Sequence, residues 1–387
     1  MKLSDFDYPL PKEKIALFPD EQRTGAKLLC IDKVSGVCSH RVFSDLPGLL
    51  NPTDLLVLNN TKVLPARLFG KKVTGGKVEA LLLKEVGANV WETLLKPGGR
   101  IKDGERITFI RHPEEDPRPD EGSQGGILRV AQKEGSRSPV HARSGGGDEA
   151  ISLVGTVIAS AEPHSGKRRI RFEGADVKDK IKKLGHIPLP PYIDRDDIEL
   201  DRSMYQTVFA EKEGAVASPT AGLHFDDALL EKIRRKGVEI VPVTLHVSYG
   251  TFQPIAVEEI ERHKMFEEEY EITEDAAARI NKAKREGRRV VVCGTTCVRA
   301  LESAANLIEP RSQRGVVSGR ANTSIFIHPP YEFKIVDALI TNFHMPKSTL
   351  LVMVAAFLDY DKMMNAYNTA LREDYRFASY GDAMFIA

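Results

Sequence analysis

The sequence predicts an α/β main domain that is interrupted by a small, barrel-like all-β domain. Three stretches, residues 215–233, 289–308 and 338–358, each run from an apolar strand through a polar loop into a helix, as α/β proteins do. Between residues 67 and 174 the pattern changes to short alternating strands separated by glycine, which favours an antiparallel barrel or sandwich. We therefore expect a discontinuous α/β domain of residues 1–66 and 175–387, with residues 67–174 inserted.

The composition is that of a globular protein with more than one compact unit. The chain has 387 residues, of which 42% are hydrophobic and 28% are charged. Lys and Arg number 55 and Asp and Glu number 55, so the formal net charge is zero. A polyanionic partner would therefore have to be bound by a local basic patch, because the field of the whole protein does not attract it. Nucleic acid is neither implied nor excluded.

Cysteine usage and hydropathy predict a cytoplasmic protein without a metal. The four cysteines show no CxxC spacing, and no pair of histidines accompanies Cys293 and Cys297. No secretory signal and no long apolar span is visible, so we expect no contact with a membrane.

The elements outside the three stretches are predicted from apolar runs and turn residues. Pro9 and Pro11 delay a short N-terminal helix, and Pro19 ends it. Residues 178–185 form a basic helical turn, and the Pro-rich run that follows crosses the molecule in an extended form. The segment 258–270, of mixed charge, is predicted either as a helix or as a lid. The remaining predictions are strands at 27–31, 55–58 and 238–247 and helices at 201–210 and 274–287.

The insertion is predicted to contain both strands and loops. Residues 111–124 and 133–150 hold almost no large apolar side chain, so they cannot bury enough surface to offset their chain entropy. We expect them to be mobile loops on the barrel. The predicted strands are 67–73, 77–86, 90–96, 105–110, 125–130, 151–158 and 167–174.

The loops of the three stretches carry the side chains with the clearest chemical use. In the first stretch, Asp226 can accept backbone N–H groups and so begin the helix. Strand exits in an α/β sheet share one edge, so the three loops are predicted to converge on one site. The candidate side chains in these loops are Thr220 and His224, then Thr295 and Thr296, then Thr341, Asn342 and His344.

Seven blocks of the sequence carry a family resemblance. They are NNTKVLPARL, GHIPLPPYIDR, SPTAGLHF, LHVSYGTF, GTTCVRALES, TNFHMPKSTL and YRFASYGDAMFI. Together they resemble the signature blocks of the S-adenosylmethionine:tRNA ribosyltransferase-isomerase family of queuosine biosynthesis, over nearly the whole chain except the polar loops. Three positions depart from the family pattern. Ser248 stands where Gly is usual, and Phe266 stands where His is usual. The family pattern has PGY before EFK, whereas this chain has PPY there, with Pro330 in the middle.

The resemblance implies a specific reaction. The ribosyl carbons of S-adenosylmethionine are transferred to 7-aminomethyl-7-deazaguanine at the wobble position of a tRNA, and the products are epoxyqueuosine-tRNA, adenine and methionine. It also implies S-adenosylmethionine as co-substrate, the modified tRNA as partner, no permanently bound cofactor and no metal. We expect a monomer.

Such chemistry needs a base, donors to the leaving adenine and an anchor for the amino-acid end. His224 and His344 are candidates for acid or base because the unperturbed histidine pKa lies near neutrality, and Asp382 is the next candidate. Thr295 and Thr296, at a helix start, can hold a carboxylate or phosphate. The other predicted binding residues are Arg299 and Asp382 for charged ends, Thr341 and Asn342 for a base edge, and Thr220, His246 and Tyr380.

Each of these residues also has a purely structural interpretation. A loop histidine can bond a nearby carbonyl, and Thr295 and Thr296 can simply cap their helix. Asp382 can stabilise its own turn, and Tyr380 can belong to the core without stacking on a base.

Two basic clusters are candidates for phosphate contacts. The alternative is a solvated face of the barrel and its neighbouring helix. The residues are Lys167, Arg168, Arg169 and Arg171 in the insertion, with Lys178 and Lys182 after it.

Two other functions fit parts of the sequence. An S-adenosylmethionine-dependent RNA methyltransferase would share the co-substrate, but no GxGxxG loop follows an early strand, and it would not release adenine. A non-catalytic RNA-binding protein would explain the barrel and the basic clusters, but not three polar loops at strand exits.

Overall fold

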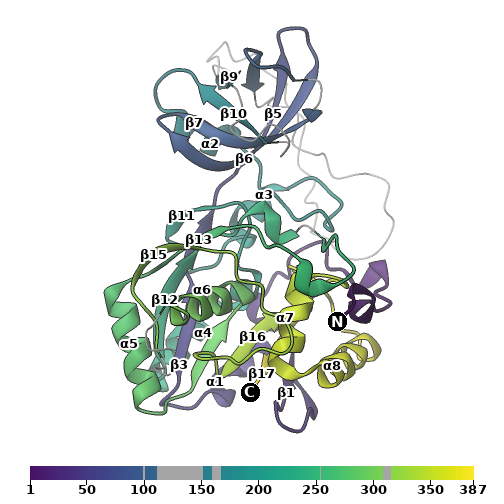
Figure 1. Cartoon of the computed structure of the whole chain (residues 1–387), viewed down its shortest axis with the longest axis vertical. Helices are drawn as coiled ribbons and strands as arrows, with labels where there is room; N and C mark the ends of the chain where they lie inside the picture. Colours follow the sequence, from purple (N-terminus) through teal and green to yellow (C-terminus); the bar gives the residue numbers. More distant parts are fainter. Residues whose placement is uncertain (99–100, 111–150, 159–166, 253, 308–314) are drawn as a thin grey trace, which may run out of the picture.

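The computed structural model describes residues 1–387 except 99–100, 111–150, 159–166, 253 and 308–314. It consists of a mixed β-sheet covered by helices and a closed antiparallel barrel (Figure 1). The predicted fold class, an α/β part with an inserted all-β part, is therefore confirmed. The stretches 111–124 and 133–150, predicted as mobile loops, and the predicted strand 125–130 lie outside the described residues.

The main sheet has a parallel centre. Its strands in spatial order are β15 (Gly319–Thr323), β13 (Glu268–Ile272), β12 (Glu239–Leu245), β3 (Leu55–Asn59), β14 (Val290–Cys293), β16 (Ala338–Asn342), β17 (Ala383–Ile386), β1 (Lys27–Ile31) and β2 (Cys38–Val42). The four central strands β12, β3, β14 and β16 run parallel to one another, whereas β17 runs antiparallel to β16. The carboxyl ends of the four central strands consequently lie at one edge of the sheet.

Helices cover both faces of this sheet (Figure 1). The α-helices are α1 (Leu46–Leu49), α2 (Val177–Leu184), α3 (Glu199–Met204), α4 (Asp227–Arg235), α5 (Glu274–Arg285), α6 (Thr295–Ala305), α7 (Thr349–Leu358) and α8 (Tyr360–Arg372). The 3₁₀ helices are η1 (Leu3–Phe6), η2 (Lys12–Lys14), η3 (Arg23–Gly25), η4 (Phe43–Asp45), η6 (Thr220–His224), η7 (Tyr249–Phe252) and η8 (Ile260–Arg262).

The alternation of side chains along the strands explains the layers. In β3, Leu55 and Val57 pack with residues of α5 to α8 on one face, and Leu56 and Leu58 pack with α1 and α4 on the other. Successive strand residues point to opposite faces, so a strand that is apolar throughout must be covered on both sides. All five residues of β3 are buried, as this arrangement requires.

The barrel closes in the order β10-β7-β6-β5-β8-β9. Its strands are β5 (Arg67–Lys72), β6 (Lys77–Gly87), β7 (Val90–Lys96), β8 (Arg106–Ile110), β9 (Ser152–Ile158) and β10 (Lys167–Phe172). Inward side chains such as Trp91, Ile107 and Ile170 form its core, and Val177 and Ile181 of α2 pack against that core. Among the described residues 67–174 there is no α-helix, in agreement with the predicted all-β character.

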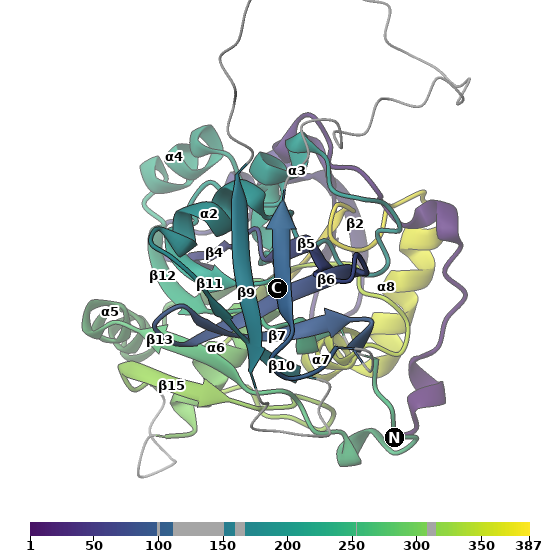
Figure 2. The same cartoon turned by 90° about the horizontal axis from the view of Figure 1, so that it is seen from above.

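The chain enters and leaves the barrel at one narrow junction. Arg67 and His186 exchange two backbone hydrogen bonds, of 3.2 and 2.8 Å, so the two connections lie side by side. A Cβ atom on Gly185 would lie 1.8 Å from the Pro65 carbonyl oxygen, so only glycine fits there. Figure 2, viewed from above, shows the barrel strands over the main-sheet part of the molecule.

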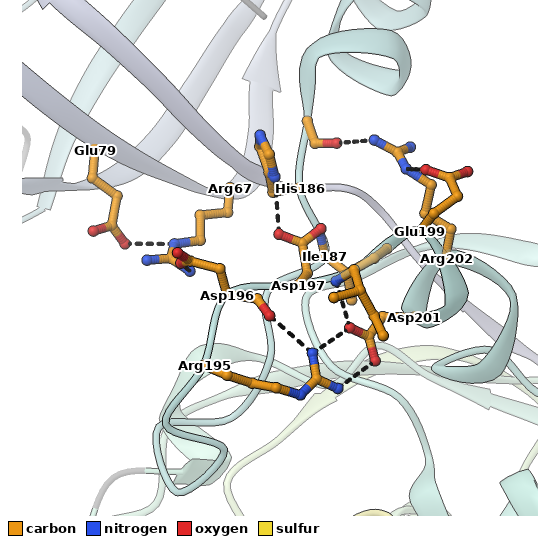
Figure 3. A network of polar contacts seen from close by, with 12 residues as sticks. Arg67, Glu79, His186, Ile187, Arg195, Asp196, Asp197, Glu199, Asp201 and Arg202 are labelled. Atoms are coloured by element: carbon orange, nitrogen blue, oxygen red, sulfur yellow. Dashed lines mark hydrogen bonds and ion pairs between the residues drawn. The ribbon is translucent and has the colours of Figure 1, made fainter. Parts of the chain in front are cut away.

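Polar contacts extend this junction into the α/β part (Figure 3). Arg67 pairs with Glu79 of the barrel, with 3.0 Å between Nε and Oε1, and His186 Nδ1 lies 2.9 Å from Asp197 Oδ1. The guanidinium of Arg195 binds both oxygens of the buried Asp201 carboxylate at 2.6 and 2.8 Å. These contacts fix the segment after the barrel against α3.

Four predicted elements differ from the observed ones. The N-terminal helix is only the 3₁₀ turn η2, which ends at Lys14 and not at Pro19. The first strand–loop–helix stretch does not start in the main sheet, because β11 (Lys212–Ala215) ends before Val216 and pairs with β4 (Thr61–Val63) in a two-stranded sheet. The helix predicted at 201–210 is the shorter α3. The segment 258–270, predicted as a helix or lid, forms η8 and the start of β13, which pairs with β12 and β15. None of the described helices combines the length and the apolar character that crossing a membrane would require.

Candidate active site

A cavity of about 380 Å³ lies at the carboxyl edge of the central strands. We call it the small cavity. The structure brings the three predicted loops together around it, although the first loop reaches it from β11. The polar lining side chains from these loops are Ser218, Thr220, Thr295, Thr296, Thr341, Asn342, His344, Lys347 and Ser348, and further lining comes from residues that include Tyr192, Val247, Thr251 and Ser379.

The second loop presents the start of α6 to the small cavity. Gly294 has φ +87°, a left-handed conformation that favours glycine, and its N–H donates to the Ile340 carbonyl at 2.8 Å. The helix begins directly after it, so the first N–H groups of α6 have no partner within the helix. Asn59 at the end of β3 donates to Thr296 Oγ1 at 3.1 Å and thereby fixes that side chain. The arrangement can bind an anionic group.

The third loop holds His344 in the wall of the small cavity. Its Nε2 lies 2.9 Å from Thr341 Oγ1, its backbone N–H donates to the Tyr367 hydroxyl at 3.0 Å, and its carbonyl accepts from the Tyr8 hydroxyl. Burial lowers the pKa of His344 to about 3, because the charged imidazolium would lose its hydration. His344 is therefore a neutral, fixed imidazole at physiological pH.

His224 has a different position from the one predicted. It does not line the small cavity; its Nε2 accepts a hydrogen bond from the Asn342 amide at 3.2 Å, and its ring packs 5.0 Å from Phe43. Thr220 donates to the Asn342 amide oxygen at 2.9 Å, so His224 and Thr220 together fix the orientation of Asn342. Burial lowers the pKa of His224 to about 4. His224 thus contacts the lining of the small cavity through Asn342.

Few charges face the small cavity. Among the described lining residues Lys347 is the one cation, it pairs with Asp7, and no carboxylate is present. The lining consists otherwise of hydroxyl, amide, imidazole and apolar groups.

Arg299 does not reach the small cavity, contrary to the prediction that it anchors a charged end. It is 2% exposed and forms a buried ion pair with Glu268. The other oxygen of Glu268 accepts from the Ser248 N–H and the Thr251 hydroxyl, both at 2.7 Å. Because Thr251 lines the small cavity, Arg299 acts on it only through Glu268 and the loop that Glu268 holds.

The side chains of Asp382 and Tyr380 are bonded to other parts of the fold. The Asp382 carboxylate accepts from the backbone N–H groups of Lys27 at 2.8 Å and Arg376 at 2.7 Å, which joins the C-terminal segment to the start of β1. The Tyr380 hydroxyl donates to Asp201 at 2.6 Å and its ring packs on Tyr205. Neither residue lines the small cavity, so their predicted roles as base and as binding residue are not supported.

A second, larger hollow adjoins the small cavity at Val247. We call it the groove; it has a volume of about 880 Å³ and lies between the barrel with α2 and the β12–β13 edge of the main sheet. His246 lines the groove and not the small cavity, with its Nδ1 2.8 Å from Thr61 Oγ1.

Three of the six predicted RNA-binding residues line the groove, namely Lys167, Lys178 and Lys182. Lys178 Nζ lies 2.7 Å from Glu85, and Lys182 Nζ lies 3.0 Å from Glu213. The others are elsewhere on β10. Arg169 lies 3.7 Å from Glu92, Arg168 donates to the Lys167 carbonyl, and Arg171 is exposed.

The three departures from the family pattern are distributed differently. Ser248 and Phe266 line the groove, and Phe266 packs so closely on Gly250 that a Cβ there would lie 2.5 Å from the ring. Pro330 lies outside the linings of both the small cavity and the groove. No group of three or more His, Cys, Asp or Glu side chains in the described part of the chain is arranged to hold a metal.

Sequence reasoning missed several lining residues. The Tyr192 hydroxyl and Ser379 Oγ lie 2.7 Å apart in the cavity wall, and Asn59 supports Thr296 from behind. Each of these residues lies in one of the seven sequence blocks. Its position in the sequence, however, does not indicate that it lies near the three loops. Only the fold brings these residues to the cavity.

Comparisons with known proteins cover the whole chain. A family model described as "Queuosine biosynthesis protein" matches residues 3–386. A curated S-adenosylmethionine:tRNA ribosyltransferase-isomerase from Sulfurihydrogenibium sp. (strain YO3AOP1) is 45% identical over 387 residues, which is 100% of both chains. The crystal structure of an S-adenosylmethionine tRNA ribosyltransferase from Thermotoga maritima is 31% identical, with a TM-score of 0.51 and coverage of 99% of this chain and 100% of that chain.

Proposed function

This chain belongs to the S-adenosylmethionine:tRNA ribosyltransferase-isomerase family of queuosine biosynthesis, and from that premise we propose that its reaction takes place in the small cavity. The protein is a transferase that uses S-adenosylmethionine as substrate. The ribosyl carbons are transferred to 7-aminomethyl-7-deazaguanine at the wobble position of tRNA, with release of adenine and methionine.

One observation carries this proposal, namely that three polar loops far apart in the sequence line a single cavity. Thr220, Thr296 and His344 come from different loops and face the same space of about 380 Å³. Pockets for small ligands and cofactors usually measure about 300–1,000 Å³ and place few polar groups in an apolar wall. The small cavity fits that description.

The start of α6 is our candidate for the anchor of the amino-acid end. Its free N–H groups and the positive end of the helix dipole favour a carboxylate. Thr296 is held by Asn59, so its hydroxyl is already oriented before a substrate binds. Thr220 and His224 orient the amide of Asn342, which can form hydrogen bonds with the edge of a base. We therefore assign Asn342 to the adenine of the co-substrate.

His344 is our candidate for the base. Removal of a proton from the carbon beside the sulfonium converts the cationic co-substrate into a neutral ylide and the imidazole into an imidazolium. One net positive charge is present before and after the transfer. The low polarity of the cavity would oppose the separation of opposite charges, but this step only moves a positive charge. The depressed pKa makes His344 a weak base, but it keeps the imidazole unprotonated at neutral pH.

The groove is our candidate for the tRNA site, with residues 67–174 acting as a separate tRNA-binding domain. Lys167, Lys178 and Lys182 can contact phosphates, and the groove is wide enough for an extruded nucleotide. Because the groove meets the small cavity at Val247, a base in the groove can reach a co-substrate in the cavity.

Two bulky substitutions test this division. Met345→Trp fills the small cavity, which Met345 lines, and should abolish S-adenosylmethionine binding while tRNA binding persists. Asn322→Trp obstructs the groove and should do the reverse. Binding of each substrate is measured separately by calorimetry, with adenine release from S-adenosylmethionine and modified tRNA as the activity. S-adenosylmethionine binding that survives Met345→Trp would place the co-substrate elsewhere.

The two alternative functions lose their support. A methyltransferase would not release adenine, and a non-catalytic RNA-binding protein would not consume S-adenosylmethionine, whereas the full-length relative is named as a ribosyltransferase-isomerase.

A further inference from the structure

Ser218 has a buried hydroxyl group without a hydrogen-bond partner. Its side chain is 5% exposed, and neither a donor nor an acceptor in the described part of the chain reaches its Oγ. Six buried side-chain atoms of the described residues share this property: Trp91 Nε1, Arg169 Nε, Tyr205 OH, Thr207 Oγ1, Ser218 Oγ and Ser248 Oγ. Of these residues, Ser218 alone lines the small cavity.

Buried polar groups are nearly always paired, because leaving one unpaired costs free energy. The neighbouring hydroxyls follow this rule. Thr220 donates to Asn342, and Tyr192 and Ser379 are paired with each other. No hydrogen bond to another described residue occupies the Ser218 hydroxyl, so it is available to a bound molecule.

We propose that Ser218 forms a hydrogen bond with an uncharged polar group of the adenosine part of S-adenosylmethionine; this rests on the proposed placement of the co-substrate. The start of α6 provides the positive potential that a carboxylate requires, whereas Ser218 is an uncharged hydroxyl. A hydroxyl suits a ribose hydroxyl or a purine nitrogen, to which it can donate or from which it can accept.

The proposal predicts effects of opposite sign on stability and on binding. Ser218→Ala removes an unpaired buried hydroxyl, so without ligand the variant should unfold at or above the wild-type temperature. It also removes the partner of the ligand, so binding of S-adenosylhomocysteine and 5′-methylthioadenosine should weaken about 3- to 10-fold, the usual net effect of one hydrogen bond. Binding of methionine should not change.

Thr207→Val is the matched control. Thr207 is also 5% exposed and its hydroxyl is also unpaired, but it does not line the small cavity. Thr207→Val should also unfold at or above the wild-type temperature, but its affinity for the two adenosine compounds should be that of the wild type. Thermal unfolding and calorimetric titration of the full chain give both quantities.

Three outcomes would overturn the inference. Unchanged affinity for both adenosine compounds in folded Ser218→Ala excludes the hydrogen bond, and an equal loss in Thr207→Val makes the effect a general one. If the wild-type protein releases adenine but Ser218→Ala binds normally, the Ser218 inference fails and the proposed function stands; a wild-type protein that binds neither compound overturns both. Should Ser218→Ala not fold, Ser218→Cys keeps the size with a weaker donor and should show a loss in the same direction.

Discussion

The small cavity and the groove adjoin each other at Val247 and differ in almost every other respect. The small cavity is walled by hydroxyl, amide and imidazole groups, with one lysine and no carboxylate among its described lining residues. The groove is lined by charged residues of both signs, including Lys167, Lys178 and Lys182 opposite several glutamates. One region therefore offers neutral dipoles, and the other offers charges.

The difference fits the two substrates that we propose for these regions, because the substrates have opposite requirements. A small cation that reacts in a water-poor space is best served by groups that need not be desolvated and that are already oriented. A polyanion in an open groove is attracted by lysines, whose ammonium groups can exchange one anionic partner for another. Because Lys178 and Lys182 are paired with Glu85 and Glu213, a phosphate must displace those carboxylates. The groove should consequently bind RNA less tightly than three unpaired lysines would.

The largest expected effect is a loss of kcat that differs between His344 and His224. His344→Ala should lower kcat by roughly 10²- to 10⁴-fold with little change in S-adenosylmethionine affinity, because proton transfer acts only in the transition state. His224→Ala is the matched control and should cost less, since it merely releases Asn342. Adenine release under saturating substrates measures both. Equal losses in the two variants would contradict the assignment of the base.

The pH profile tests the same residue in a second way. Burial lowers the pKa of His344 to about 3, so its neutral form should persist in the free enzyme as the pH falls well below 6.5. The kcat/KM profile should show no acid limb near pH 6.5 that belongs to this group. A limb near pH 6.5 that disappears in His344→Ala would show that His344 titrates normally.

The next effect concerns the boundary between the two regions. Arg299→Ala should destabilise the fold by about 3–5 kcal/mol, because it leaves the Glu268 carboxylate buried without its cation. Urea unfolding measures this, with Arg235→Ala, from an exposed helical pair, as the control at about 0–1 kcal/mol. A folded Arg299→Ala of unchanged stability and weaker S-adenosylmethionine binding would instead support a direct anchor.

The smallest effect is on the groove. The triple variant Lys167→Gln, Lys178→Gln and Lys182→Gln should weaken tRNA binding on the order of tenfold, and the slope of log affinity against log salt should become shallower by about 0.7–0.9 for each phosphate that is no longer neutralised. S-adenosylmethionine binding should be unaffected. Arg171→Gln, exposed on β10 but outside the groove, serves as the control. If the salt slope of the triple variant is unchanged, these three lysines do not contact RNA phosphates.

Local sequence determined the elements and much of the small cavity. Apolar runs gave β1, β3 and β12 within a few residues, and Asp226 begins α4 as predicted, accepting from the Leu229 N–H at 2.7 Å. Thr296 and His344 could be proposed as site residues because strand exits in an α/β sheet share an edge, whereas Thr220 reaches the cavity from β11, outside the main sheet. The alternating strands between residues 67 and 174 indicated the barrel. Apolar and polar residues alternate along a strand with one buried face, and this pattern does not depend on which strands pair.

Only the tertiary structure decided which polar side chains face the cavity and which are used up by the fold. His224, Arg299, Asp382 and Tyr380 look equivalent to site residues in the sequence, yet each is directed at a partner more than 25 positions away. The same holds for the lysines, whose glutamate partners lie on other elements. The physical reason is that a polar side chain takes its role from the partner it meets, and packing between distant elements sets that partner.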